Sequence, residues 1–135
     1  MERILLYVHF NKCNHISGHV FYQLEQLKPL FSKIIFISNS PLSNEDKCRL
    51  REDLGISDLL KRDNRGFDFA AWRDGMNRLG FDTLQNSDSL TLMNDTCFGP
   101  LWDLAPIYQR FEEDSQVDFW GMTNFRKTRY FEEHL

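Results

Sequence analysis

Three short apolar runs, spread along the chain, constrain its fold more than any other feature. They occupy residues 4–8, 34–37 and 89–93, and longer segments with apolar residues three and four positions apart lie between them. Short aliphatic runs are typical of buried strands, whereas the longer spacing is typical of amphipathic helices. Strands that alternate with helices predict an α/β protein with a mostly parallel sheet and right-handed crossovers.

The predicted elements follow one another without an internal repeat or a linker. Strands are predicted at residues 4–8, 34–37, 58–62, 89–93 and 117–122, and helices at about 18–31, 43–55, 69–79 and 100–111, with a further helical segment after residue 122. Ser43 and Asp46 resemble a capping box, and Gly80 suits a C-terminal cap. Pro100 suits the first turn of a helix. We therefore expect one domain over residues 1–135, with three layers and helices on both faces of the sheet.

The composition argues against several classes of protein. The formal net charge is −4 and no stripe of Lys and Arg is present, so nucleic acid is not an expected partner. Cys13, Cys48 and Cys97 lie far apart, which argues against a zinc site or a disulfide framework and favours a reducing compartment. The apolar run near the N-terminus is too short for a signal peptide or a membrane span, so we expect a soluble chain.

Polar residues gather where three of the predicted strands end. Ligands of parallel α/β sheets bind beyond the carboxyl ends of the strands. This rule selects the loops at residues 9–11, 63–68 and 94–99. The familiar phosphate-loop, metalloprotease and nucleophile-elbow signatures are missing from the sequence.

The loop DNRGFD, residues 63–68, combines groups that suit an anionic ligand. Gly66 allows a tight turn, and Arg65 can donate two hydrogen bonds to a phosphate. The start of the following helix adds free amides and a partial positive charge. Asn64 can donate and accept hydrogen bonds, and Asp68 is expected to cap the helix or to meet a ligand hydroxyl. The alternative is a plain connection, in which Asn64 forms the turn, Asp68 caps the helix and Arg65 is solvated.

The loop MNDTCFG, residues 93–99, contains a single carboxylate, that of Asp95. A carboxylate just past a buried strand is a common way to hold a divalent cation, and Asn94 and Thr96 could add neutral oxygens. The alternative, which the loop by itself slightly favours, is an Asx-type turn.

Two other positions are candidates for ligand contact or chemistry. His9 and Asn11 end the first strand, where a loop reaches the base of a nucleotide in most open α/β sheets. A lone His at a strand end more often has no such task. Asp118 lies on the predicted strand 117–122, whose aromatic residues are explained by core packing.

The succession of these motifs resembles a known family. The order NRGFDFAAWRDGM, a strand, MNDTCFGPL and VDFWGMT is similar to the rhamnan synthesis protein F family, whose members are glycosyltransferase-related proteins of bacterial cell-wall and surface-polysaccharide synthesis. The resemblance spans residues 1–135 and is densest between Asp63 and Thr123. Each motif alone is weak, whereas their order is fairly specific.

The wider resemblance is to glycosyltransferases of the GT-A type, which implies a Rossmann-like nucleotide-binding domain. Asn64 and Gly66 match the Asn-x-Gly turn of those enzymes, and Arg73 matches part of the helix that follows. The sequence NDT at residues 94–96 stands where those enzymes carry a DxD motif, which holds a divalent cation against the donor diphosphate. Only Asp95 is acidic here, so the resemblance implies Mg²⁺ or Mn²⁺ at Asp95 and leaves metal dependence open.

The resemblance implies transfer of a sugar, rhamnose, from a nucleotide donor such as dTDP-rhamnose to a glycan or lipid-linked acceptor. The expected location is the cytoplasm, with peripheral association at the inner face of the membrane and no transmembrane segment. The expected donor-binding residues are His9, Asn11, Asn64, Arg65, Gly66, Asp68, Arg73, Asn94, Asp95 and Thr96.

The sequence gives less information about the catalytic residues. An inverting transfer needs a general base, for which Asp118 is a weak candidate. GT-A enzymes usually carry an acceptor-binding half after the DxD strand, so we expect the chain to be a fragment that is incomplete at its C-terminus. The alternatives are a non-catalytic GT-A-like module that binds a glycan or a partner, and a phosphotransferase, which the missing phosphate-loop glycines disfavour.

Overall fold

Four parallel strands form the sheet of the first of two structural units. The computed structural model describes residues 1–122 and divides the chain into the units Met1–Asp103 and Leu104–Leu135. The strands are β1 (Arg3–His9), β2 (Lys33–Ser38), β3 (Asp58–Lys61) and β4 (Ser89–Asn94), in the order β3-β2-β1-β4. All three pairings are parallel, as the sequence predicts. The expectation of a single domain stays a prediction.

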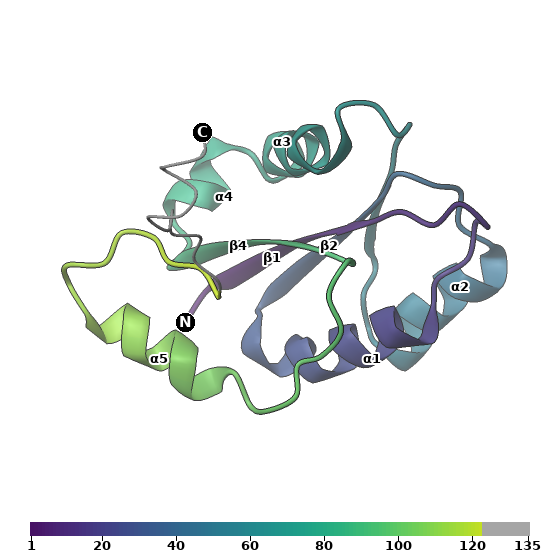
Figure 1. Ribbon diagram of the computed structural model, residues 1–135. Helices are drawn as coiled ribbons and strands as arrows, with labels where there is room; N and C mark the ends of the chain where they lie inside the picture. Colours follow the sequence, from purple (N-terminus) through teal and green to yellow (C-terminus); the bar gives the residue numbers. More distant parts are fainter. Residues whose placement is uncertain (123–135) are drawn as a thin grey trace, which may run out of the picture. The chain divides into compact units, whose positions relative to one another are not determined.

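Helices cover both faces of this sheet (Figure 1). On one face lie α1 (Gly18–Leu27), which continues into a 3₁₀ turn at Lys28–Leu30, and α2 (Asn44–Cys48), which continues into a π-helical turn at Arg49–Asp53. On the other face lie α3 (Phe67–Leu79) and α4 (Phe81–Gln85). The first unit is therefore a three-layer, Rossmann-like α/β fold, as predicted. The second unit contains α5 (Ala105–Glu113).

The central strands are buried because both of their faces are covered. Leu6 and Val8 of β1 and Ile37 of β2 pack with Ala71 and other residues of α3, and none of these four is more than 1% exposed. Burial of such side chains contributes roughly 1.5–3 kcal/mol each. On the opposite face the Tyr7 hydroxyl donates to Gln23 Oε1 of α1 at 2.6 Å.

Gly75 allows α3 to approach the sheet closely. A Cβ atom at this position would lie 2.7 Å from Ile37 Cδ1 and 3.1 Å from Leu6 Cδ1. A larger residue would push the helix away and with it the loop that precedes it.

Several sequence predictions of local structure are confirmed. The Ser43 hydroxyl caps α2 by accepting from the Asp46 amide at 3.0 Å. Gly55 ends the same helical segment with a φ of 66°, and Gly80 follows α3 with a φ of 82°. Positive φ angles favour glycine because it lacks a Cβ atom.

Other local predictions are wrong. Residues 117–122 form no strand. Pro100 does not begin a helix: it lies in a loop, after a cis peptide bond with Gly99, and α5 begins later with Pro106 in its first turn. The short helix α4 was not predicted from the sequence. The predicted helix after residue 122 lies outside the residues that the structure describes.

No helix among residues 1–122 is long and apolar enough to cross a membrane. Cys13, Cys48 and Cys97 are free and exposed.

Candidate functional site

The carboxyl edge of the sheet brings together the three loops that the sequence selects. One loop follows β1, a second joins β3 to α3, and the third follows β4. Strands β1 and β4 are neighbours, and α3 begins at this same edge (Figure 1).

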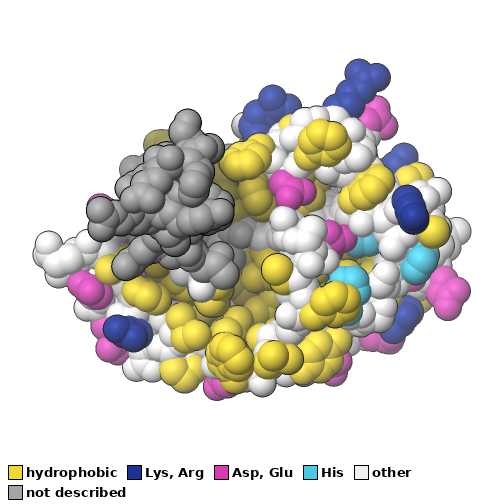
Figure 2. All heavy atoms as spheres, in the orientation of Figure 1, with side chains coloured by type: hydrophobic (Ala, Val, Ile, Leu, Met, Phe, Trp, Pro, Cys, Tyr) yellow, Lys and Arg dark blue, Asp and Glu magenta, His cyan; other side chains and the backbone are white. Residues whose placement is uncertain are grey.

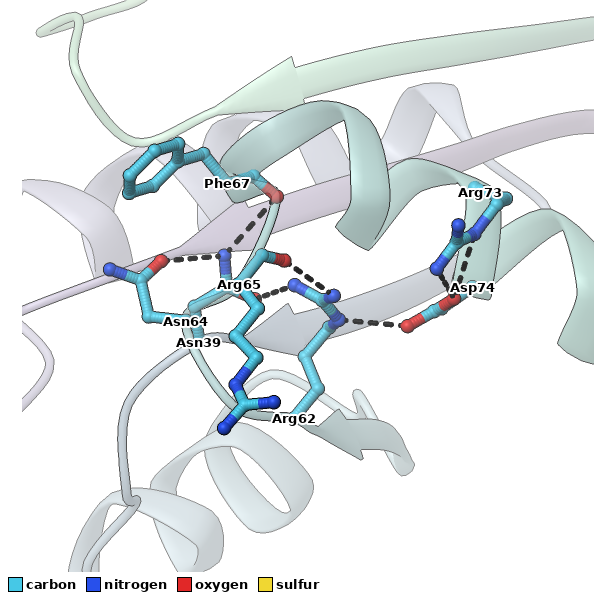
Figure 3. A network of polar contacts seen from close by, with 7 residues as sticks. All are labelled: Asn39, Arg62, Asn64, Arg65, Phe67, Arg73 and Asp74. Carbon is cyan, nitrogen blue, oxygen red and sulfur yellow. Dashed lines mark hydrogen bonds and ion pairs between the residues drawn. The ribbon is translucent and has the colours of Figure 1, made fainter.

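Arg62 fixes the loop between β3 and α3 (Figure 3). Its Nε donates to Asp74 Oδ2 at 2.9 Å, Nη1 donates to Asn39 Oδ1 at 2.8 Å, and Nη2 donates to the Arg65 carbonyl at 2.9 Å. The side chain is 12% exposed. A planar guanidinium with three fixed acceptors sets the path of the whole turn. Sequence reasoning missed this residue.

A short polar chain continues from Arg62 through Asn39 to the turn itself. The Asn39 side-chain amide donates to Asn64 Oδ1 at 3.2 Å and to the Phe67 carbonyl at 3.4 Å. Gly66 has a φ of 71°, and Phe67 has a φ of 50°, which is strained for a residue with a Cβ atom. Asn64 and Gly66 therefore shape the turn, as the sequence indicates.

The first turn of α3 keeps free backbone donors. Gly66 is the N-cap residue, and no side chain caps the helix. The backbone amides of Phe67, Asp68 and Phe69 donate no hydrogen bond within the described part of the chain. The prediction that Asp68 caps the helix is wrong, because Asp68 Oδ2 instead accepts from the Asn94 side chain at 2.8 Å.

The two arginines predicted at this site differ in their surroundings. The Arg65 side chain is exposed, and its guanidinium makes no hydrogen bond or ion pair with residues 1–122. Figure 3 shows it apart from the contacts of the other labelled residues. Arg73 is paired with Asp74, with Nη2 at 3.2 Å from Oδ1. The hydrogen bond from Arg62, with help from Arg73, lowers the pKa of Asp74.

Asn94 links the loop after β4 to the start of α3. Besides its bond to Asp68, it accepts from the Thr96 hydroxyl at 2.8 Å and from the Thr96 amide at 3.4 Å. This is an Asx-type turn, so the alternative that the sequence left open holds for Asn94. The indole Nε1 of Trp72 on α3 donates to the Met93 carbonyl at 3.2 Å and ties the same two elements.

Asp95 links the loop after β4 to the loop after β1. Its Oδ2 accepts from the Phe10 amide at 3.1 Å, and its carbonyl lies 3.1 Å from Nε2 of His19. The side chain is half-buried, and its Oδ1 makes no hydrogen bond within residues 1–122. One carboxylate oxygen is therefore available to a ligand.

His9 and Asn11 support the site from within. His9 is 1% exposed, lies 3.0 Å from the Ser38 hydroxyl through Nδ1, and packs on Phe36. Burial lowers the pKa of His9, although the Asp95 charge opposes this shift. Asn11 accepts from the Cys13 amide at 2.8 Å and donates through Nδ2 to Ser17 at 3.3 Å. These contacts hold the loop after β1 in place, and contact of His9 and Asn11 with a donor stays a prediction.

The described residues at this edge of the sheet offer few oxygen ligands for a cation. Among the described residues, no three His, Cys, Asp or Glu side chains gather in a way that could hold a metal ion. Asp95 offers one free carboxylate oxygen, and Asp68 shares its charge with Asn94. Cation sites usually take six or more oxygen ligands, so these residues do not fit a resident metal by themselves.

Exposed aromatic rings surround the polar groups. Phe67, Phe69 and Phe98 are 68%, 82% and 79% exposed; the first two lie in the first turn of α3, and Phe98 lies in the loop after β4. Phe69 packs edge-on against Trp72, and Phe98 lies 4.5 Å from the His19 ring. Figure 2 shows hydrophobic side chains beside His and acidic groups at the right of the view. Phe67, Phe69 and Phe98 are therefore not part of the hydrophobic core.

Asp118 lies in the second unit, at an exposed bend rather than on the strand predicted for it. Its role as a general base stays a prediction.

The comparisons with known proteins agree with the motif order. The profile of the family described as rhamnan synthesis protein F matches residues 34–135, about three quarters of the chain. An uncharacterized protein, y4gN, of Sinorhizobium fredii (strain NBRC 101917 / NGR234) is 29% identical over 115 residues, which are 85% of this chain and 29% of that relative. The chain thus spans less than a third of the curated relative that it matches. No solved structure matches it. The chain belongs to the rhamnan synthesis protein F family.

Proposed function

We propose that the first unit binds the nucleotide-sugar donor of a glycosyltransferase that acts in rhamnan or related surface-polysaccharide synthesis. The observation that carries the proposal is the state of the turn at residues 64–69. The exposed guanidinium of Arg65, which has no partner among residues 1–122, stands beside three free amides at the start of a thirteen-residue helix. Free helix amides and a guanidinium together favour a phosphate or diphosphate group.

The surrounding groups suit the rest of such a donor. Asp68 carries a negative charge near the helix start, which opposes an anion there and instead suits a sugar or ribose hydroxyl as hydrogen-bond donor. The exposed rings of Phe67, Phe69 and Phe98 provide apolar faces on which a sugar ring or a base could stack. The donor proposed is a nucleoside-diphosphate sugar, with dTDP-rhamnose as the candidate that the family description favours.

The reaction proposed is transfer of the sugar to a hydroxyl of a glycan or lipid-linked acceptor. Arg65 and the amides of α3 would stabilise the negative charge that develops on the departing diphosphate, the electrostatic contribution that such a transfer needs. A divalent cation would add charge stabilisation at Asp95 if the diphosphate supplied most of its ligands. The general base is unassigned in the first unit. We place the reaction in the cytoplasm at the inner face of the membrane, where lipid-linked acceptors are presented.

Calorimetry on the 135-residue chain tests this function. dTDP and dTDP-rhamnose should bind with similar affinity, while thymidine and rhamnose should not bind measurably, because the proposal places the diphosphate at the centre of recognition. Binding of thymidine as tight as that of dTDP would contradict it.

A second candidate is a donor-binding module without catalytic activity. The observation that favours this version is that Asp95 offers one free carboxylate oxygen among the described residues. Release of free sugar from dTDP-rhamnose, followed by chromatography, separates the two. Binding without hydrolysis or transfer supports the module, whereas turnover that saturates with donor supports the enzyme.

A further inference from the structure

A cavity lies at the amino ends of β2 and β3, at the opposite edge of the sheet from the candidate donor site. Its volume is about 550 Å³. It is lined by the starts of these strands, by the segment after α1 and by the last turn of α3. Ligand pockets commonly enclose about 300–1,000 Å³, so this cavity has room for a molecule of monosaccharide size.

The charge of this cavity contrasts with that of the chain. Lys28, Lys33 and Arg78 line it together with a single carboxylate, that of Asp58. The formal local charge is therefore positive in a chain with a net charge of −4. A concave site of one sign concentrates ligands of the opposite sign.

The ion pairs of Asp58 do not neutralise all of the positive charge in this cavity. Arg78 Nε lies 2.7 Å from Asp58 Oδ1, whereas Lys33 Nζ lies 4.0 Å from Oδ2. Lys28 makes no hydrogen bond or ion pair through its ammonium group within residues 1–122. Arg78 is thus occupied by Asp58, Lys33 is held loosely, and Lys28 is available.

Gly55 leaves room for the ammonium group of Lys28 in the wall of the cavity. A Cβ atom at Gly55 would lie 2.7 Å from Lys28 Nζ, and the φ of 66° at Gly55 also favours glycine. Phe31, Ile34 and Ile56 are each at most 9% exposed and give the cavity an apolar floor. The lining therefore pairs cations with an apolar surface.

We propose that this cavity binds a small phosphate monoester, such as a phosphorylated sugar, through Lys28 and Lys33. The dianionic phosphate lies between the two ammonium groups, and the organic part rests on the apolar floor. The site is separate from the donor site at residues 64–69, since it lies at the other end of the strands.

The test is calorimetric titration of the 135-residue chain with glucose 6-phosphate, inorganic phosphate and glucose. Saturable binding of glucose 6-phosphate, tighter than that of inorganic phosphate and absent for glucose, is expected. Affinity should fall as salt rises, because the contact is electrostatic. Vesicles of phosphatidylcholine with phosphatidic acid form a further arm: binding to these vesicles and not to glucose 6-phosphate would overturn the proposal in favour of a lipid headgroup. Absence of saturable binding to all of these would overturn it as well.

Variants locate the binding. Lys28→Gln with Lys33→Gln should weaken glucose 6-phosphate at least tenfold, whereas the matched control Lys12→Gln with Lys47→Gln should change affinity less than twofold. All four lysines are described and outside the hydrophobic core, and circular dichroism confirms that each variant is folded. Equal losses in the two double variants would overturn the assignment. So would a comparable loss in Arg65→Gln, because that result would place the phosphate at the donor site.

Discussion

At the scale of single residues, the site depends on a residue that carries no motif. Arg62 joins Asn39, Asp74 and the Arg65 carbonyl, and these contacts bridge up to 23 positions of sequence. Gly66 and Asn64 can be predicted from the sequence, because the residue preferences of a turn depend only on neighbouring positions. Arg62 cannot be predicted in this way, because its partners are set by the packing of β2, β3 and α3.

Replacing Arg62 tests this role directly. Arg62→Gln leaves Asn39 and the Arg65 carbonyl without their charged donor, so the free energy of unfolding should fall by about 1.5–3 kcal/mol. Arg51 is exposed, and its guanidinium makes no hydrogen bond or ion pair with residues 1–122, so Arg51→Gln should change this free energy by less than about 0.5 kcal/mol. Urea denaturation of the three proteins provides the comparison. Equal stability of wild type and Arg62→Gln would refute the role.

The same variant has a pH signature. The pKa of Asp74 is lowered in the folded chain, first by the hydrogen bond from Arg62. A lowered folded-state pKa means that the ion pair stabilises the fold above the unfolded-state pKa and that this stability is lost as pH falls through the folded-state pKa. NMR titration of the Asp74 carboxyl should show its pKa rising in Arg62→Gln. An unchanged pKa would show that Arg73 or another group controls it.

The structural contact of Asp95 can be tested separately from the ligand contact proposed for it. Asp95→Asn should keep the fold, because an amide oxygen can still accept from the Phe10 amide. If a cation bridges Asp95 and a diphosphate, the variant should lose most of the gain in dTDP affinity that Mg²⁺ or Mn²⁺ gives. Titrations with metal and with chelator measure this gain. If the affinity for dTDP changes neither with metal nor with the substitution, the role of Asp95 is only to support the loop after β1.

At the scale of elements, the sequence correctly predicts the strands and helices whose apolar residues pack into the core of the first unit. The runs 4–8 and 34–37 become the fully buried β1 and β2, and the spacing in α3 places Ala71 and Leu79 on the sheet. No strand forms at 117–122: Phe119 is 92% exposed, and Trp120 packs on a helix. Trp120 stacks on Phe111 and meets Tyr108 edge-on, both on α5. The apolar character of this stretch therefore reflects the contact of Trp120 with α5 and not a buried strand.

The close packing of α3 on the sheet should be disturbed by a single added methyl group. Gly75→Ala should lower the free energy of unfolding by about 1–3 kcal/mol, because its Cβ overlaps Ile37 and Leu6. Gly18→Ala is the matched control, since a Cβ there meets nothing within 4 Å. Thermal unfolding should rank Gly75→Ala below Gly18→Ala. The reverse order would mean that α3 can shift on the sheet without loss of stability.

At the scale of the whole molecule, the chain combines a Rossmann-like unit with a second, smaller one. Among residues 1–122, the four strands and every buried apolar residue except Tyr108 belong to Met1–Asp103. The motif order identifies the family from the sequence, because it depends on residue types and their succession. The separation of the two units and the cavity at the amino edge depend on packing and were not predictable in that way.

The concentration of the core in one unit gives a prediction for the whole chain. A protein of residues 1–103 should unfold in one cooperative transition in urea, because it retains the sheet and the four helices that cover it. Circular dichroism and tryptophan fluorescence should report the same midpoint. Broad, non-coincident transitions would show that residues after 103 are needed for the first unit to fold.

The central claim is that the turn before α3 holds a nucleotide diphosphate, and Arg65 tests it most directly. The affinity of dTDP should be measured by calorimetry for wild type, Arg65→Gln and Arg51→Gln at one salt concentration. A charge-assisted contact to phosphate contributes about 1.5–3 kcal/mol, so Arg65→Gln should bind roughly 10- to 150-fold more weakly. Arg51→Gln should bind as the wild type does. Equal dTDP affinity in all three proteins would contradict the claim.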